Sequence, residues 1–423
     1  MKKVGIAISV LLSVVMSAAL AQTGRQTFLG VDPGKSNIPL DQILRGNPVP
    51  QGIPSIGHEG DWIGWTTPTP GARFVSQEEA AAWLSDREPV VAMSINGVSR
   101  AYPLQILTYH EIANDVIGEI PVAVTFCPLC NSAIAFDRRI PLTQEALDTV
   151  VAENPNASLV DLDEEFFDHY TFQHGVMPEF VKGVEVTFGT TGLLFNSNLI
   201  MFDSQTSTFW TQILGEGNVG ALTDTVLLNY PAQIISFAEF RETFPEGSVL
   251  SRDTGFSRPY GNNPYVGYDD ADSPPFLFPG MTDGRLPPKA RVVSVDLRGE
   301  TVAYPFEILV QDRVVNDQVG DEPVTVFWQV GTSSALNSDT IASGRDIGAV
   351  GVFSRSVADR VLTFEWREEG FVDNETGSRW NLSGRAVEGE LSGAQLTPIV
   401  HDNTLWFAWA AFKPETRIFV GDN

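Results

Sequence analysis

The chain has 423 residues, 43% of them hydrophobic and 10% aromatic, which suffices for two or three domains with hydrophobic cores. Such a composition excludes an intrinsically disordered protein. The 53 acidic and 27 basic side chains give a net charge of −26, which argues against nucleic acid or an anionic membrane as a partner. We interpret this acidity as a source of solubility rather than as an acidic docking face.

The first residues have the pattern of a secretory signal peptide. Lys2 and Lys3 precede an apolar core over residues 4–16, and Ala19-Leu20-Ala21 forms a small-residue cleavage site before Gln22. The segment is too short for a membrane span, so we favour cleavage over a retained anchor. Residues 1–21 are therefore predicted to direct export to the periplasm or the extracellular space. The mature protein is expected to be soluble, without a membrane span.

After an irregular arm at 22–74, the chain repeats itself. Residues 90–124 align without a gap with residues 292–326, at an offset of 202, and share Ala-Tyr-Pro, Ile-Leu, Asn-Asp and Pro-Val. FDSQTSTFW (202–210) corresponds to VDNETGSRW (372–380) at an offset of 170. Self-similarity on this scale predicts a duplicated domain. We expect a first lobe at 75–255, a linker rich in Pro, Gly and Tyr at 256–288, and a second lobe at 289–423.

The change of offset indicates an insertion in the first copy, which we place at 137–185. Thr143 is expected to cap a short helix there, and a second segment brings His169, His174 and Met177 near one another. Long excursions of this kind serve as lids or binding loops, or decorate the surface, and we favour decoration.

Outside the insertion, short runs rich in Val, Ile, Thr and aromatic residues predict strands. Helices are expected only over 76–86, 102–115, 238–244 and 304–317. The predicted fold is therefore mainly β (α+β), with two pseudo-symmetric β-rich lobes and few short helices.

Both cysteines of the chain, Cys127 and Cys130, lie in the stretch AVTFCPLCNSAIAF. A disulfide across so short a loop contributes only about 2 kcal/mol, from which strain subtracts. Two free thiols this close in an oxidising compartment are expected to be oxidised, reduced by a partner or ligated to a metal. We therefore favour active chemistry over a structural bridge or two inert thiols. Cys127 ends a predicted strand, and NSAIAF opens either a helix, which would lower the thiol pKa, or another strand.

The repeat distinguishes residues that both copies share from reactive residues that only the first copy has. At the offset of 202, Cys127, Cys130 and His110 correspond to Gln329, Thr332 and Asp312. Because the second copy lacks all three reactive side chains, we expect them to act together in the first lobe, with His110 tuning the thiol pKa or moving a proton.

Two further sets of residues also differ between the copies. Met201 has Phe371 as its counterpart and offers a soft sulfur, although packing is the favoured role. The polar residues Asn196, Ser197 and Asn198 correspond to Trp366, Arg367 and Glu368 and are weak candidates for substrate binding.

Four motifs together resemble one bacterial and archaeal family, that of domain of unknown function 3179 (DUF3179). They are AYPLQILTYHEIAND, VTFCPLCNSAIAFDR, FGTTGLLFNSNLIMFDSQTSTFW and LSRDTGFSRPYGNNPYVGY, and the resemblance covers most of the mature chain. It implies redox chemistry, because some members of this family are expected to carry selenocysteine at the CPLC position. The insertion at 137–185 departs from the usual pattern of the family, which supplies no established substrate.

Three functions remain open. The first is a thiol–disulfide oxidoreductase in which Cys127 attacks, Cys130 resolves the mixed disulfide, and a partner protein exchanges electrons. The second is a copper-binding or copper-delivery protein that holds Cu(I) through Cys127, Cys130 and either His110 or Met201. The third is a non-catalytic duplicated binding module with an incidental bridge.

The signal sequence generates the first prediction. Protein recovered from the envelope fraction of its native host should begin at Gln22, because the signal peptidase cuts after Ala21. N-terminal sequencing or intact-mass measurement checks this, and an intact Met1 on that material would contradict it.

Overall fold

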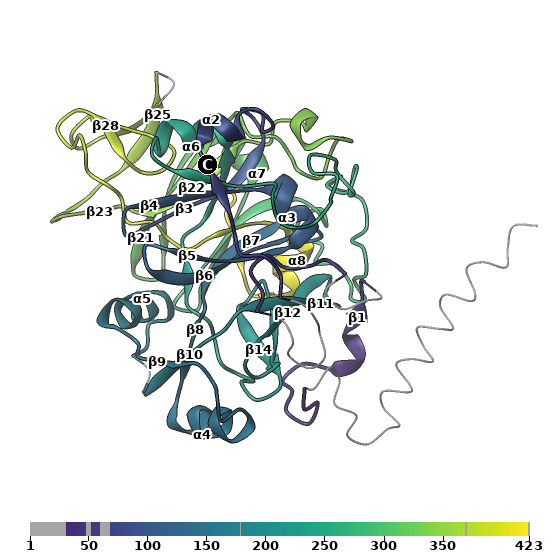
Figure 1. Cartoon of the computed structure of the whole chain (residues 1–423). Helices are drawn as coiled ribbons and strands as arrows, with labels where there is room; N and C mark the ends of the chain where they lie inside the picture. Colours follow the sequence, from purple (N-terminus) through teal and green to yellow (C-terminus); the bar gives the residue numbers. More distant parts are fainter. Residues whose placement is uncertain (1–30, 48–51, 60–67, 178, 369, 422–423) are drawn as a thin grey trace, which may run out of the picture.

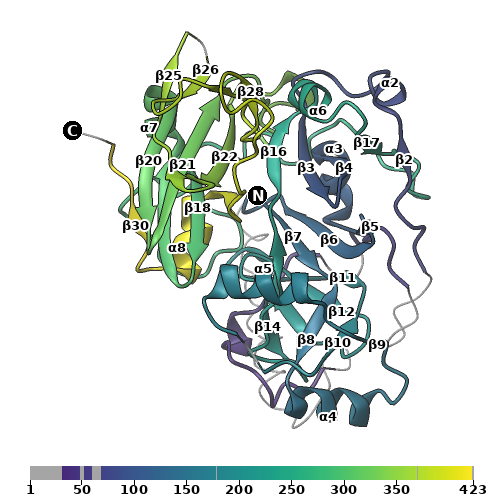
Figure 2. The same cartoon turned by 90° about the vertical axis from the view of Figure 1, so that its left-hand side faces the viewer.

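The fold is described from a computed structural model, which covers residues 31–47, 52–59, 68–177, 179–368 and 370–421. The predicted signal peptide, residues 1–21, lies outside the described residues. The described chain is mainly β, as the sequence predicts, with seven short α-helices among thirty strands. Figures 1 and 2 show the blue strands of the first half beside the green and yellow strands of the second. In the ranges that the structure describes, no helix is long and apolar enough to cross a membrane.

The first half contains a five-stranded sheet built around a β-hairpin. In sheet order its strands are β16 (Gln233–Ser236), β3 (Pro89–Ile95), β4 (Val98–Pro103), β17 (Ser248–Leu250) and β2 (Phe74–Val75). The β3–β4 hairpin turns at Asn96-Gly97, and both residues have positive φ, as the tight two-residue turns of hairpins require. β16 pairs antiparallel with β3, and β17 pairs parallel with β4.

The second half contains a sheet with the same strand order. Its strands are β29 (Asp402–Leu405), β18 (Arg291–Leu297), β19 (Glu300–Pro305) and β30 (Arg417–Ile418). β29 pairs antiparallel with β18, and β30 pairs parallel with β19. The register of the β18–β19 hairpin is that of β3–β4 displaced by 202 residues. A duplication predicts such a correspondence, and it remains our interpretation of the two halves.

A short helix and a three-stranded meander follow each hairpin. In the first half they are α3 (Leu104–His110), β5 (Ile112–Ile117), β6 (Ile120–Cys127) and β7 (Ser132–Asp137), with β15 (Asn229–Tyr230) added beside β7. In the second half they are α7 (Phe306–Asp312), β20 (Val314–Val319), β21 (Glu322–Gln329) and β22 (Ala349–Ser354).

The helices expected over 102–115 and 304–317 are therefore shorter than predicted. Glu111 and Arg313 follow their last residues with φ of 58° and 63°, a conformation that cannot continue a right-handed helix. The chain then enters β5 or β20, whose backbone groups pair with the next strand. Tertiary pairing thus replaces the second half of each predicted helix.

A third antiparallel sheet completes each half. In the first half it consists of β11 (Phe188–Phe195), β12 (Asn198–Asp203), β13 (Phe209–Thr211) and β14 (Glu216–Val219), with β1 (Leu44–Arg45) at the edge. In the second half it consists of β25 (Phe364–Arg367), β26 (Gly370–Asp373), β27 (Arg379–Trp380) and β28 (Ala386–Glu388). The remaining short strands are β23 (Ser356–Val357) and β24 (Arg360–Val361).

The insertion forms a three-stranded sheet of its own and two helices, the first of which lies at the bottom of Figure 2. It holds β8 (Arg139–Leu142), α4 (Gln144–Glu153), β9 (Leu159–Val160), α5 (Glu164–His174) and β10 (Lys182–Glu185). The predicted cap is confirmed, since the Thr143 side chain accepts a hydrogen bond from the Ala146 N–H. The insertion also contacts the second half, because the Arg298 N–H donates to the Gln173 carbonyl over 3.0 Å.

Three further helices complete the described chain: α2 (Gln77–Ala80), α6 (Phe237–Thr243) and α8 (Trp406–Phe412). α2 begins at Ser76, which forms a capping box with Glu79, but it ends earlier than the predicted 76–86. β29 and α8 matter most for the site, because they join the second half to a core cluster that contains Cys127 and Cys130.

The buried carboxylate of Asp203, in the first half, generates a stability prediction. Asp203 accepts hydrogen bonds from the Thr206 N–H and hydroxyl and from the buried Trp210 Nε1 at 3.0 Å. Replacing Asp203 by Ala leaves these buried donors without an acceptor, so we expect a loss of about 2–4 kcal/mol of unfolding free energy. Urea unfolding followed by tryptophan fluorescence measures it.

The exposed acid Asp359 serves as the control, and Asp359→Ala should change the unfolding free energy by less than about 0.5 kcal/mol. If Asp203→Ala changed stability as little as the control does, the role assigned to the buried carboxylate would be wrong.

Candidate functional site

The CPLC stretch forms the turn between β6 and β7. The Cys130 N–H donates to the Cys127 carbonyl over 3.2 Å, so the two cysteines occupy the first and last positions of one β-turn. Pro128 stands at the second position, where its fixed φ suits the turn. NSAIAF continues as a strand, with Ser132 paired to Cys127, so the helix weighed for this segment does not form. The turn brings the two Cα atoms within the ~7 Å that defines it, a separation that a disulfide also allows.

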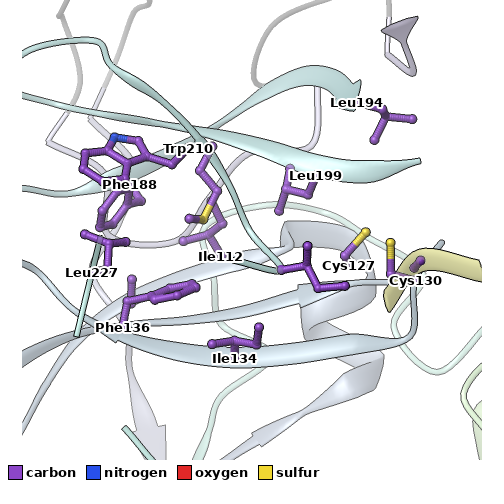
Figure 3. Packing of buried hydrophobic residues seen from close by; sticks show 14 of the residues in the cluster. Ile112, Cys127, Cys130, Ile134, Phe136, Phe188, Leu194, Leu199, Trp210 and Leu227 are labelled. Atoms are coloured by element: carbon purple, nitrogen blue, oxygen red, sulfur yellow. The ribbon is translucent and has the colours of Figure 1, made fainter. Parts of the chain in front are cut away.

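Both cysteines are free thiols and are buried, with 1% of Cys127 and none of Cys130 exposed. Figure 3 shows the two sulfurs side by side, pointing toward the strand that carries Leu199. The Ser197 carbonyl lies 3.6 Å from the Cys130 sulfur and 3.9 Å from that of Cys127. The two thiols thus share one buried environment next to the Ser197 carbonyl.

The surroundings shift the two thiol pKa values in opposite directions. Burial raises the pKa of Cys127, but hydrogen bonds from the Cys130 thiol and from the backbone N–H groups of Leu199, Cys130 and Leu129 outweigh it and lower that pKa. Burial, the hydrogen bond to Cys127 and the Cys127 charge raise the pKa of Cys130 well above its ordinary value. Cys127 is therefore the more readily ionised of the two thiols.

Two of the three polar residues predicted at 196–198 lie next to the sulfurs. Asn196 and Ser197 form the β11–β12 turn with φ of 50° and 67°. The Asn198 Nδ2 lies 3.5 Å from the Cys130 sulfur and 2.9 Å from the Gln212 Oε1. Ser197 and Asn198 thus surround the thiols, whereas Asn196 serves the turn.

The predicted partner His110 has its hydrogen bonds elsewhere. Its Nδ1 donates to the Pro54 carbonyl over 2.7 Å, and its Nε2 lies 2.6 Å from the Tyr260 hydroxyl. Burial lowers the pKa of His110 to about 4, so at neutral pH the ring carries no charge. In this arrangement His110 fixes Tyr260 of the linker, and the structure shows no hydrogen bond between it and either sulfur in the described chain.

The neighbouring Glu111 faces Cys127 instead. Its backbone N–H ends α3 by donating to Leu107, and its carbonyl accepts from Phe126, one residue before Cys127. Burial, then the charge of Cys127, raise the pKa of Glu111 well above its ordinary value. The sequence comparison missed this residue, although the corresponding Arg313 in the second half was a signal that could have identified it.

Met201 belongs to the same buried cluster as the cysteines, where it packs in β12 between its pairing partners Thr190 and Trp210. This agrees with the packing role favoured for it. Among the described residues, no group of three or more His, Cys, Asp or Glu side chains is arranged to hold a metal ion.

The second half supplies four residues to the turn. The Leu405 N–H and the Thr404 hydroxyl both donate to the Cys130 carbonyl, over 2.8 and 3.0 Å. The Asn131 Nδ2 donates to the Asn403 carbonyl over 2.8 Å. The Ala133 N–H donates to the Asp402 Oδ1 over 2.9 Å. Burial raises the pKa of Asp402 to about 7, and its charge contributes to the raised pKa of Cys130.

The linker covers the site with tyrosines, as its composition suggests. The pKa of Tyr265 is raised by burial and then by the charges of Glu111 and Cys127, which places this ring near both. Burial also raises the pKa of Tyr268, and so do the charges of the two cysteines. The Ser197 hydroxyl ties the linker down by donating to the Phe276 carbonyl over 2.6 Å.

The lowered pKa of His110 generates a pH prediction. The unfolded chain takes up the proton near the ordinary pKa of ~6.5, but the folded chain only near 4, so this group favours unfolding as the pH falls through that window. In His110→Asn, which keeps a donor for the Pro54 carbonyl, this proton uptake is absent. The variant should be less stable than the wild type at pH 7, and that difference should shrink by up to about 3 kcal/mol by pH 4. Urea unfolding of both proteins across this range measures the difference, and a constant difference would contradict the assignment.

Comparison with known proteins gives one match. The model of a family described as "Protein of unknown function (DUF3179)" matches residues 50–416, which include both halves, the linker and the insertion. No match was found among curated proteins, and none among solved structures. Because this one family model spans most of the sequence, including the CPLC turn and the β29 strand that holds it, the chain belongs to the DUF3179 family.

Proposed function

We propose that the protein is an exported thiol–disulfide redox protein whose centre is Cys127 and Cys130. The observation that supports this most is the β-turn that places two free thiols together, with backbone N–H groups and the Cys130 thiol stabilising negative charge on the Cys127 sulfur. A thiolate is the nucleophile of disulfide exchange, and a neighbouring thiol that keeps its proton suits the resolving step.

The proposed exchange proceeds in two steps. The Cys127 thiolate attacks one sulfur of a substrate disulfide, a mixed disulfide forms, and the second substrate sulfur leaves as a thiolate. Cys130 then loses its proton and attacks the Cys127 sulfur, which forms the Cys127–Cys130 disulfide and releases the first substrate sulfur. Two electrons pass from the protein to the substrate, and the reverse sequence oxidises a substrate dithiol.

Asp402 is our candidate for the base that takes the Cys130 proton. Its carboxyl is buried, is electrostatically coupled to Cys130, and has a pKa of about 7, so both protonation states are populated near neutral pH. Glu111 suits this role less, because burial and the charge of Cys127 raise its pKa well above the ordinary value. The proposed centre thus uses a thiol pair from the first half and a base from the second.

The burial of both sulfurs limits which substrates reach them. A protein disulfide can contact Cys127 only after the linker tyrosines, Tyr265 and Tyr268, move aside. His110 and Ser197 each hold this linker by one hydrogen bond, to Tyr260 and to Phe276. We therefore expect exchange with proteins to be slow until the linker opens, whereas a small disulfide has less to displace.

Alkylation of the reduced protein as a function of pH tests the proposal. Cys127, measured in Cys130→Ser, should react with an apparent pKa below the ordinary ~8.5, although the serine removes one stabilising thiol. Cys130, measured in the matched Cys127→Ser, should react with an apparent pKa above that value. A small aromatic disulfide should trap a mixed disulfide on Cys127 in the first variant, visible by mass spectrometry.

Three results would overturn the redox proposal. Equal and ordinary pKa values would remove the nucleophile. A Cys127–Cys130 disulfide that resists millimolar dithiothreitol in the folded protein would make the pair a structural bridge. One equivalent of tightly held copper after purification without chelator would favour the copper-binding alternative.

Asp402→Asn tests the assigned base within the same experiment. Asparagine keeps an acceptor for the Ala133 N–H, so the turn should survive. The resolving step should slow by about 100-fold, while the attack of Cys127 changes little. Asp359→Asn, at an exposed position, is the control. Equal slowing of both steps would indicate a disturbed turn rather than a missing base.

A further inference from the structure

A second polar site lies on the other side of the CPLC hairpin. A cavity of about 270 Å³ is lined by residues of α5 of the insertion, β14, β18, β29 and α8. It brings together three parts of the chain that are far apart in sequence. Its titratable and amide side chains are those of Gln173, His174, Glu216, Asn229, Asp296, His401, Asp402 and Lys413.

Four of these residues have a buried polar atom without a hydrogen-bond partner among the described residues. The atoms are His174 Nε2, Asn229 Oδ1, His401 Nε2 and Asp402 Oδ2. His401 and Asp402 are 6% and 4% exposed, so bulk water does not reach them freely. Buried polar atoms in native proteins almost always have a partner, and four around one cavity indicate that its contents supply the partners.

Three of the four atoms are hydrogen-bond acceptors. The His401 Nδ1 lies 2.8 Å from the Ile399 carbonyl, which can only accept, so Nδ1 carries the proton and Nε2 presents a lone pair. An amide Oδ1 accepts, and so does the Asp402 Oδ2 when that carboxyl is ionised. The cavity thus offers acceptors and calls for a ligand rich in donors.

The net charge of the cavity lining is negative, which suits a ligand that carries N–H donors and a positive charge. Glu216, Asp296 and Asp402 contribute three carboxyl groups, against the single ammonium of Lys413. Lys413 pairs with Asp296 at 2.7 Å and its charge also acts on Glu216, so one ammonium faces three carboxyl groups at this cavity. A cationic ligand would compensate them, whereas an anion would be repelled.

We propose that this cavity binds a small organic cation that carries N–H donors, a primary amine of low molecular mass. Its volume is below the ~300–1,000 Å³ of pockets for drug-sized molecules, so the ligand is small. A metal ion fits less well, because the described His, Asp and Glu side chains do not form a group of three arranged to hold one. A protonated amine needs no such geometry, because each of its N–H groups donates to a single acceptor.

The cavity and the cysteine turn also share one residue. Asp402 lines the cavity and accepts from the Ala133 N–H of the CPLC hairpin, and its charge raises the pKa of Cys130. A bound ammonium would therefore act on a carboxyl group that both sites share. The binding itself does not depend on the redox proposal.

Isothermal titration calorimetry with 1,4-diaminobutane tests the inference on the mature chain at pH 8 and about 0.15 M salt, which screens the acidic surface. We expect saturable binding of one equivalent. The uncharged 1,4-butanediol, of the same length, should not bind. His401→Asn removes the Nε2 acceptor but keeps a donor for the Ile399 carbonyl, and Glu216→Gln removes one charge. Each should raise the Kd at least about tenfold, while the exposed control Asp359→Asn should leave it unchanged.

Circular dichroism and thermal melting of each variant establish that it is folded, and two cavity variants are used so that the loss of one to misfolding still leaves a result. Absence of diamine binding would show a cavity filled by water alone and would overturn the inference. So would equal binding of the diol, equal binding to both cavity variants and the wild type, or displacement of the diamine by one equivalent of Zn²⁺.

Discussion

The structure of the site depends on the hydrogen bonds between β29 and the CPLC turn. Two donors from the second half, the Leu405 N–H and the Thr404 hydroxyl, converge on the single carbonyl of Cys130. Each such bond contributes about 1 kcal/mol, but leaving its buried partner unsatisfied costs more. The turn is therefore specified by residues that follow it by more than 270 positions. The second half, which lacks the cysteines, is needed to hold them.

This arrangement explains why the pKa values of the two thiols shift in opposite directions. Two thiolates in one buried environment would repel each other strongly, so the first charge raises the pKa of the second group. The N–H groups of Leu129, Cys130 and Leu199 converge on Cys127 and lower the pKa of its thiol. The charge of Asp402 is one of the factors that raise the pKa of Cys130. The asymmetry follows from backbone geometry, and it does not need the imidazolium that the sequence suggested at His110.

The insertion also takes part in the packing between the two halves. Through α5 it reaches the β18–β19 hairpin of the second half and closes a polar cavity whose far wall includes β29. Asp402 belongs to both the cavity and the cysteine turn, so the two sites meet at one carboxyl group with a pKa of about 7. Surface decoration, the interpretation favoured from the sequence, does not account for this contact between the halves.

The sequence by itself determined the β-rich class, the helix caps at Ser76 and Thr143 and the closeness of Cys127 to Cys130. It could do so because propensity, capping and turn chemistry act over a few residues. The alignment at 202 also indicated two similar halves, whose strand order corresponds in the structure. Only the tertiary structure decided that residues 112–117 form a strand, since the positive φ at Glu111 and the pairing with β6 override local helical propensity. It likewise decided that Glu111 and Asp402, rather than His110, influence the sulfurs. Burial and electrostatic contact between residues hundreds of positions apart depend on how the halves pack, and no local pattern encodes that.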